Sequence, residues 1–375
     1  MQTETTTSQS VITEEMVAQA WETVLNRKSV DRDADFRRLG MSSNRPMRIV
    51  REIWRTMNID LPVNVFYTAP TIRRMASAIR DGSALIAPDL IRLRDGDESA
   101  PLFLFPGGGG VLFELDDLVN TLDWPGVIYG LPFSGLDGIG PSYDRFEQEA
   151  VRSFEIIRRV QRSGPYRLAG YSIGGITALE TARLIKREGE ERIFLGLIDT
   201  PQNDHSWPFR VWLGFILSKV AKRLSKIFSR PASLKTSASS MRRPPTANLP
   251  EKRNINPPHR GTQLEFRFRN PEDPNYPYYS PYWVSHHTPN YSRVAANACR
   301  MKGFYTPGQY DGHVFFFASE RGEPLVCDPQ AVWPKYLPRA EWIRLPGDHF
   351  SLLIGRNAAR LAAEITKRMR QIAPP

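Results

Sequence analysis

The segment Gly170-Tyr171-Ser172-Ile173-Gly174-Gly175 constrains the fold of this chain more than any other. The residues just before it, from Tyr166 onward, have the pattern of a strand, and those after it repeat apolar side chains at helical spacing. A serine between glycines at a strand-to-helix junction is typical of a nucleophile elbow, in which small residues permit a sharp turn and the hydroxyl is exposed. An ordinary glycine-rich turn is the alternative, which the flanking patterns disfavour. We therefore predict that Ser172 is a nucleophile.

A serine hydroxyl needs a base to take its proton before it can attack. His349 follows a strand-like segment and precedes the last helical stretch, and a surface histidine is the other interpretation of it. The chain order Ser, acid, His places the acid between residues 172 and 349. Asp199 and Glu320 each follow an apolar, strand-like run. Either carboxylate could orient the imidazole and stabilise its charged form.

A second glycine-rich loop, Phe105-Pro106-Gly107-Gly108-Gly109-Gly110, follows another strand-like run. It lacks the lysine of a phosphate-binding P-loop and the spaced glycines of a dinucleotide-binding turn. In a serine hydrolase, a loop at this place donates an N–H to the developing oxyanion, beside the N–H of the residue after the nucleophile. We therefore expect Gly107, with Gly108 as the alternative, and Ile173 to be the oxyanion donors.

From Pro101 onward, short apolar runs alternate with amphipathic helical stretches. This alternation predicts an α/β fold with a mostly parallel sheet and right-handed crossovers. The alternation stops after Asp199 and resumes as a strand near His313. We therefore expect an insert over about 203–295.

The chain has 50 Lys and Arg residues against 40 Asp and Glu residues, which gives a net charge of +10. Residues 203–262 contain twelve basic and two acidic residues, so the rest of the chain is neutral overall. A uniformly basic protein would suggest nucleic-acid binding, but a single basic segment without a nucleic-acid-binding motif indicates a local feature. We expect no nucleic-acid partner.

The pattern of residues 11–82 is different, because three apolar stripes at helical spacing follow one another. Thr13 is a plausible N-cap of the first, so this region predicts a small all-α bundle. Residues 83–98 have the composition of a linker, and 99–373 form the α/β region.

No apolar run reaches the length of about 18 residues that spans a membrane. Two cysteines form no disulfide framework or zinc site, so no metal is expected and a reducing cytoplasm is the expected location.

At these motifs, residues 99–373 outside the basic insert resemble the type I thioesterase domain that ends nonribosomal peptide and polyketide synthases. The matching segments are Pro-Leu-Phe-Leu-Phe-Pro-Gly-Gly-Gly-Gly, Gly-Pro-Tyr-Arg-Leu-Ala-Gly-Tyr-Ser-Ile-Gly-Gly, Leu-Ile-Asp-Thr-Pro and Leu-Pro-Gly-Asp-His-Phe-Ser. The resemblance implies an α/β-hydrolase fold and favours Asp199 over Glu320 as the acid. It also implies that the insert is a helical lid over the acyl pocket.

The lid has an apolar stripe at helical spacing within 210–228, formed by Leu213, Ile216, Val220 and Leu224. We expect this stripe to line one wall of the acyl pocket, with a loose polar loop over 230–260. A basic amphipathic helix is also typical of segments that lie on an anionic membrane, and we favour the packed lid over membrane contact.

The N-terminal region resembles a carrier domain, which holds substrate on a phosphopantetheine arm. The matching residues are Trp21, Phe36, Leu39-Gly40, Ser43 and Phe66-Tyr67-Thr68-Ala69-Pro70-Thr71. The resemblance implies that 4′-phosphopantetheine is attached covalently to Ser43, with Ser42 as the alternative, at a helix N-terminus that favours phosphate. Ser42, Asn44 and Pro46 depart from the family pattern, and four arginines crowd the face that usually docks partners. A degenerate, unmodified bundle is the alternative interpretation.

A carrier domain followed by a thioesterase domain implies release of an acyl or peptidyl chain from the arm, by hydrolysis or cyclisation, through Ser172, His349 and Asp199. The implied setting is nonribosomal peptide or polyketide-type biosynthesis. The implied partners are an acyl or peptidyl thioester substrate, upstream synthase modules and a phosphopantetheinyl transferase. The alternatives are a non-catalytic carrier and docking scaffold, and a serine esterase or lipase that acts on free esters.

Overall fold

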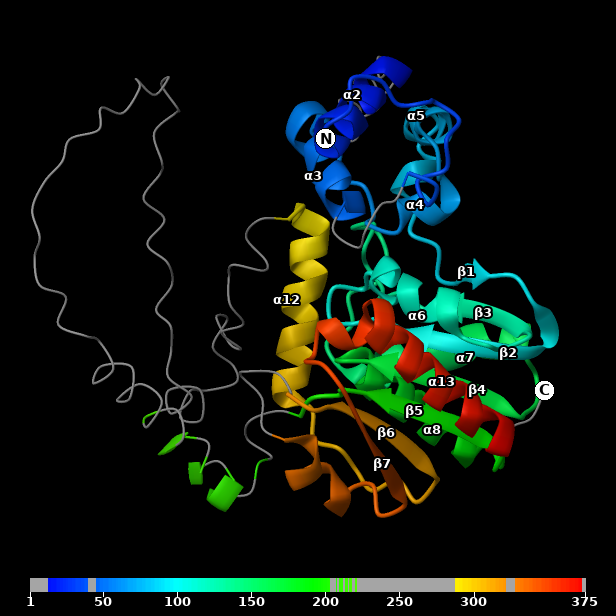
Figure 1. Cartoon of the computed structure of the whole chain (residues 1–375), viewed down its shortest axis with the longest axis vertical. Coiled ribbons are helices and arrows are strands. Elements are labelled where there is room, and N and C mark those ends of the chain that lie inside the picture. Colours follow the sequence, from blue (N-terminus) through cyan, green and yellow to red (C-terminus); the bar gives the residue numbers. More distant parts are fainter. Residues whose placement is uncertain are drawn as a thin grey trace, which may run out of the picture.

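The computed structural model describes residues 13–39, 45–202, 287–321 and 328–372 of the 375-residue chain, together with Trp207 and scattered residues between 209 and 220. Figure 1 shows a helical bundle stacked on an α/β domain, with helix α12 running from that domain toward the bundle. Within the described residues, no helix has the length and apolar character needed to cross a membrane.

The bundle forms a small hydrophobic core of its own. Its helices are α2 (Glu14–Leu25), α3 (Arg45–Met57), α4 (Val65–Thr68) and α5 (Ile72–Arg80). The Thr13 hydroxyl accepts the Met16 N–H at 3.3 Å, which confirms the predicted N-cap of α2. The ring of Phe66 lies 5.5 Å from that of Trp21 and 5.3 Å from that of Phe36, and all three side chains are fully buried. This aromatic cluster joins the helices and the loop after α2.

The α/β domain is built on one seven-stranded sheet in the order β1-β3-β2-β4-β5-β6-β7. The strands are β1 (Ile91–Arg94), β2 (Asp97–Phe105), β3 (Gly126–Gly130), β4 (Tyr166–Tyr171), β5 (Ile193–Ile198), β6 (Val314–Ser319) and β7 (Ala340–Leu345). Strand β1 is antiparallel to β3, and every other neighbouring pair is parallel. The predicted mostly parallel sheet is therefore confirmed.

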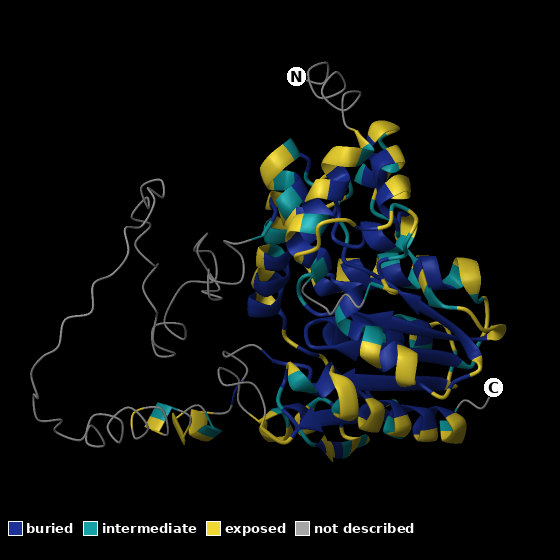
Figure 2. Cartoon of the chain, turned by 45° about the horizontal axis from the view of Figure 1, so that its top comes forward, coloured by how far each residue is buried: buried dark blue, intermediate teal, exposed yellow. Residues whose placement is uncertain are grey.

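Helices cover both faces of this sheet. They are α6 (Asp116–Thr121), α7 (Phe146–Val160), α8 (Gly174–Arg187), α12 (Pro289–Phe304) and α13 (Gly355–Ile372), with short 3-10 turns η2 (Leu112–Leu115), η4 (Pro329–Ala331), η5 (Trp333–Lys335) and η6 (Ser351–Leu353). The turn η1 (Ser83–Leu85) packs on the core of the bundle instead. Helices α7, α8 and α12 contribute to the core on one face, and α6 and α13 to the core on the other. Figure 2 shows the buried residues concentrated along the strands and the inner sides of these helices.

Residues 83–98, which were expected to be a linker, contain strand β1 and the start of β2. Ile91 is buried, and β1 pairs with β3 at the edge of the sheet. Arg94 donates to the carbonyls of Val119 and Leu122 at 2.9 and 2.6 Å. Short strands with charged side chains are typical of sheet edges, and their apolar pattern is too brief to identify from sequence.

The predicted lid insert, about 203–295, extends into helix α12. This helix begins at Pro289 and buries Val294 and Ala298 against the sheet, so its N-terminal turns belong to the packed domain. The sequence boundary was placed too late because the helix packs through small residues, which give a weak periodic signal.

Only part of the predicted lid helix lies within the described residues. Leu213 and Val220 are 38% and 49% exposed there, whereas Ile216 packs beside Trp207. That this stripe lines one wall of the acyl pocket stays a prediction, because the structure describes only scattered residues of the segment. Leu224 and the loop over 230–260 lie outside the described residues.

The helical bundle should depend strongly on its aromatic cluster. Because Phe66 is fully buried, Phe66→Ala should lower the free energy of unfolding of the bundle by about 3–5 kcal/mol. Hydrogen exchange of the α2 and α5 amides in the full chain measures this loss. Met16→Ala, on the partly exposed side of α2, is the control and should change stability by less than about 0.5 kcal/mol. Equal effects of the two substitutions would contradict this account of the core.

Candidate active site

Ser172 lies at the tight turn between strand β4 and helix α8. Its φ is +52°, a left-handed conformation that is uncommon for a residue with a side chain. Its N–H donates to the carbonyl of Ile198 at 2.8 Å, so the end of β5 helps to hold the strained turn. Such strain persists only where the surrounding structure enforces it, as at a nucleophile elbow.

Three glycines make this turn possible. A Cβ atom on Gly170 would lie 2.5 Å from the carbonyl oxygen of Gly174. A Cβ atom on Gly174 would lie 2.1 Å from the carbonyl oxygen of Pro106, and one on Gly175 would lie 1.9 Å from the Thr200 hydroxyl. The motif is therefore glycine-rich because the strand, the helix and the loop after β2 approach too closely for any larger residue.

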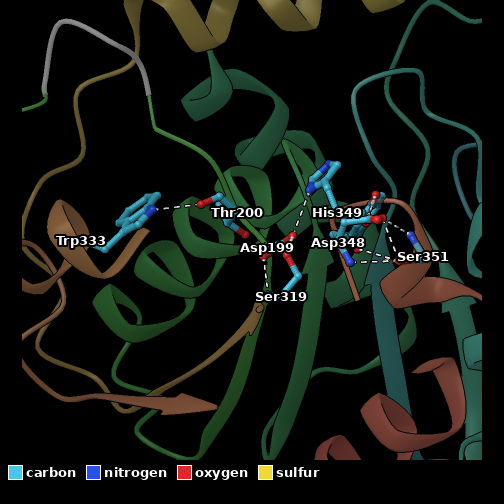
Figure 3. Close-up of polar contacts among 8 residues, drawn as sticks. Asp199, Thr200, Ser319, Trp333, Asp348, His349 and Ser351 are labelled. Carbon is cyan, nitrogen blue, oxygen red and sulfur yellow. Dashed lines mark hydrogen bonds and ion pairs between the residues drawn. The ribbon is translucent and has the colours of Figure 1, made fainter. Parts of the chain in front are cut away.

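Asp199 directly follows strand β5 and adopts a φ of +47°. Its Oδ1 accepts the Ser319 N–H at 2.8 Å, and its Oδ2 accepts the Ser319 hydroxyl at 2.6 Å. His349 Nδ1 lies 3.2 Å from the same Oδ2, as Figure 3 shows. The structure thus brings Asp199 and His349 together, whereas Glu320 is exposed and forms no such pair.

The environment of Asp199 favours its charged form. Burial alone would raise the pKa of this carboxyl group, but the hydrogen bonds with His349 and Ser319 outweigh burial and lower the pKa below its ordinary value. An ionised carboxylate beside Nδ1 fixes the ring orientation and stabilises an imidazolium.

The loop around His349 is fixed from two sides. Tyr171, the residue before Ser172, stacks on the imidazole with ring centroids 4.9 Å apart and donates its hydroxyl to the His349 carbonyl at 2.8 Å. The Asp348 carboxylate accepts the N–H and the hydroxyl of Ser351 at 2.9 and 2.7 Å. These contacts connect the elbow strand directly to the histidine loop.

The glycine loop after β2 lies against the elbow. A Cβ atom on Gly108 would lie 2.9 Å from Cδ1 of Ile173, so the two predicted sources of oxyanion donors are neighbours. The Gly107 N–H, however, donates to Oε1 of Glu114 at 2.6 Å. The N–H that we expected to serve an oxyanion is therefore engaged by a carboxylate of the same chain.

Glu114 was not identified from the sequence, because nothing in an apolar 3-10 turn marks one glutamate as pointing inward. Burial raises the pKa of this carboxyl group to about 7, and the Gly107 N–H and the charge of His349 only partly offset burial. No described Lys or Arg forms an ion pair with it. Near neutral pH this group is therefore poised between its charged and neutral forms.

We expect a charged Glu114 to weaken oxyanion stabilisation, because it competes for the Gly107 N–H and repels a developing negative charge. Glu114→Gln should speed labelling of Ser172 by a fluorophosphonate by about tenfold at pH 9, a fraction of the 10²–10³ that one oxyanion donor contributes. At pH 5, where the wild-type carboxyl group is protonated, the two rates should be similar.

The quantity compared is the labelling rate of the variant divided by that of the wild type at the same pH. Glu147→Gln, on the exposed side of α7, makes the same chemical change and should leave the ratio at one throughout. If the labelling rate of Glu114→Gln relative to wild type is the same at pH 5 and pH 9, the idea that a titrating carboxylate occupies the Gly107 N–H is contradicted.

Comparison with known proteins identifies two domain families. Residues 15–79 match the family model for a phosphopantetheine attachment site, and residues 100–210 match that for a thioesterase domain. Indigoidine synthase from Dickeya dadantii is 30% identical over 184 residues, which cover 48% of this chain and 12% of that protein. Vanchrobactin synthetase VabF from Vibrio anguillarum is 32% identical over 191 residues, which cover 49% of this chain and 7% of that protein.

A solved structure has the same arrangement of fold elements. A holo four-domain nonribosomal peptide synthetase bound to AMP and glycine aligns over 96% of this chain and 26% of its own, with a TM-score of 0.54 and 19% identity. The chain thus spans only a small part of the synthetases that it resembles. The chain therefore carries a match to a phosphopantetheine-attachment domain over residues 15–79, followed by a match to a thioesterase domain over residues 100–210 on a mostly parallel α/β sheet.

Proposed function

We propose that this chain releases an acyl or peptidyl chain from its own carrier domain, in biosynthesis of the nonribosomal peptide or polyketide type. The observation that carries the proposal is the buried Asp199–His349 pair beside the Ser172 elbow, in a domain that directly follows a carrier. A carrier supplies thioesters, and a serine with a paired histidine is suited to attack them.

The carrier domain is of the family that attaches 4′-phosphopantetheine, and we assign the attachment to Ser43, which lies outside the described residues. The following segment suits a phosphodiester, because α3 begins at Arg45, two residues after Ser43 in the sequence, and has Arg48 in its first turn. When bound, the arm supplies the thiol that carries the acyl chain as a thioester.

In the proposed first half-reaction, His349 takes the proton of Ser172 and the serine oxygen attacks the thioester carbonyl. Asp199 holds the imidazole and stabilises its positive charge. The N–H groups of Ile173 and Gly107 bind the oxyanion, which requires Glu114 to release Gly107. His349 then gives its proton to the departing sulfur, and the acyl group remains as an ester on Ser172.

In the second half-reaction, His349 is again the base. It activates either water, which releases an acid, or an amine or hydroxyl of the acyl chain itself, which releases a ring. The oxyanion donors stabilise the second tetrahedral intermediate as they did the first. Ser172 then recovers its proton from His349.

The proposed partners follow from the domain content of the chain. Neither family match covers a domain that selects or activates a substrate, so we propose that upstream synthase modules load the carrier. A phosphopantetheinyl transferase is the proposed source of the arm. A reducing cytoplasm is the proposed setting, because the two cysteines of the sequence make no disulfide framework.

The attachment site can be tested by intact mass. The wild-type chain incubated with a phosphopantetheinyl transferase and coenzyme A should gain one phosphopantetheine, and Ser43→Ala should gain none. Ser42→Ala, the adjacent hydroxyl, is the matched control and should be modified normally. Full modification of Ser43→Ala would move the site to Ser42 or elsewhere.

The triad should behave as one unit in turnover of a short acyl thioester. Ser172→Ala and His349→Ala should each lower kcat by about 10⁶-fold, and the double variant should lose little more. Asp199→Asn should cost about 10⁴-fold, because the imidazole loses its partner. Glu320→Gln should have nearly wild-type activity, and a crippled Glu320→Gln with a mild Asp199→Asn would show that the acid was assigned wrongly.

A further inference from the structure

The carrier and thioesterase domains share an interface built from the loop before α4 and from α4 itself. Val63 is buried within the hydrophobic core of the α/β domain. The Tyr67 hydroxyl donates to Oδ1 of Asp116 at 2.7 Å, and Oδ2 of Asp60 accepts the Asn290 N–H at 2.7 Å, at the first turn of α12. Apolar burial and specific hydrogen bonds thus hold the carrier in one orientation.

Asn64 makes the most specific contact of this interface. Its side chain is 1% exposed, and both ends of its amide are used. Nδ2 donates to the carbonyl of Gly110 at 2.8 Å, and Oδ1 accepts the N–H of Leu112 at 3.0 Å. The amide therefore satisfies two backbone groups of the thioesterase domain as a neighbouring β-strand would, and buried backbone groups are costly to leave unpaired.

The backbone that Asn64 holds is the glycine loop of the candidate active site. Gly110 has a φ of +70°, and its N–H donates to the Gly107 carbonyl at 2.9 Å, which closes a tight turn. Leu112 begins the turn η2, which carries Glu114 to the Gly107 N–H. Asn64 thus fixes both the turn that presents Gly107 and the segment that occupies its N–H.

We propose that Asn64 of the carrier domain is a positioning residue for the oxyanion loop of the thioesterase domain, so that the reactivity of Ser172 depends on the carrier occupying this interface. The inference rests on the proposed function, in which Gly107 binds the oxyanion. When the carrier leaves, the Gly110 carbonyl and the Leu112 N–H lose their partners, and the loop loses the contacts that set its shape. The docked carrier would therefore shape the oxyanion loop in addition to delivering the acyl chain.

The test uses the full chain with an unmodified carrier and a short acyl thioester of N-acetylcysteamine, which needs no carrier for delivery. Asn64→Asp is nearly isosteric but cannot donate to the Gly110 carbonyl. We expect loss of the turn at Gly110 to outweigh any release of Glu114, so kcat should fall by about 5- to 150-fold, the usual range for coupling between two sites, with KM changed less than twofold. A rise in kcat would overturn the proposal. Hydrogen exchange of the Leu112 amide should speed up while exchange of the α2 and α5 amides stays the same.

Two controls separate positioning from general damage. Asn120→Asp makes the same change on the exposed side of α6 and should leave both readouts unchanged. Tyr67→Phe removes an interface hydrogen bond without touching the glycine loop and should keep kcat within about twofold of wild type. If Tyr67→Phe lowers kcat as much as Asn64→Asp, loss of docking in general explains the effect and the proposal for Asn64 is overturned.

Wild-type kcat for Asn64→Asp, with unchanged exchange at Leu112, would also overturn the proposal. If Asn64→Asp disturbs the α2 and α5 amides, Asn64→Ser, which is smaller and uncharged, replaces it and must show the same selective loss of kcat. Fluorophosphonate labelling separates a failure of the proposed function from a failure of the inference about Asn64. Absence of label on Ser172 would count against the proposed function, whereas labelling at equal rates in wild type and Asn64→Asp would count only against this inference.

Discussion

Three backbone segments meet at Gly174, and the candidate site depends on how closely they approach. The end of β4, the start of α8 and the loop after β2 come together so tightly that a Cβ atom on Gly174 would lie 2.1 Å from the Pro106 carbonyl oxygen. This contact places Ser172 and the glycine loop at one edge of the sheet. The strain at Ser172 is maintained by the strands and helices on either side, whose burial stabilises the fold as a whole.

Two carboxylates near this edge have opposite environments. Asp199 receives hydrogen bonds from Ser319 and lies beside His349, so its pKa is lowered although it is buried. Glu114 has one N–H as a partner and no described Lys or Arg as an ion-pair partner, so burial dominates and raises its pKa to about 7. The charged form of Asp199 is therefore favoured beside His349, whereas Glu114 at the glycine loop changes its charge near neutral pH. This difference follows from hydrogen bonding and not from residue type.

The sequence predicts those parts of the structure that are set by local patterns. The elbow at Ser172, the parallel strands and the N-cap at Thr13 each depend on a few neighbouring residues, and the known chain order of serine, acid and histidine supplies the distant partner His349. Contacts such as that of Asn64 with Gly110, 46 residues away, leave no local pattern. The apolar stripe with Leu213 is a local pattern, and its place against the acyl pocket stays a prediction because only scattered residues of that segment are described.

The central claim is that an acyl group passes from the carrier to Ser172 within one chain, and time-resolved peptide mass mapping tests it most directly. The carrier is loaded with a labelled acyl group, the reaction is quenched at intervals, and the label is located on peptides. The account predicts that the label leaves the peptide with Ser43 and appears on the peptide with Ser172 before free product accumulates. Product that forms while the Ser172 peptide never carries the label would contradict the account.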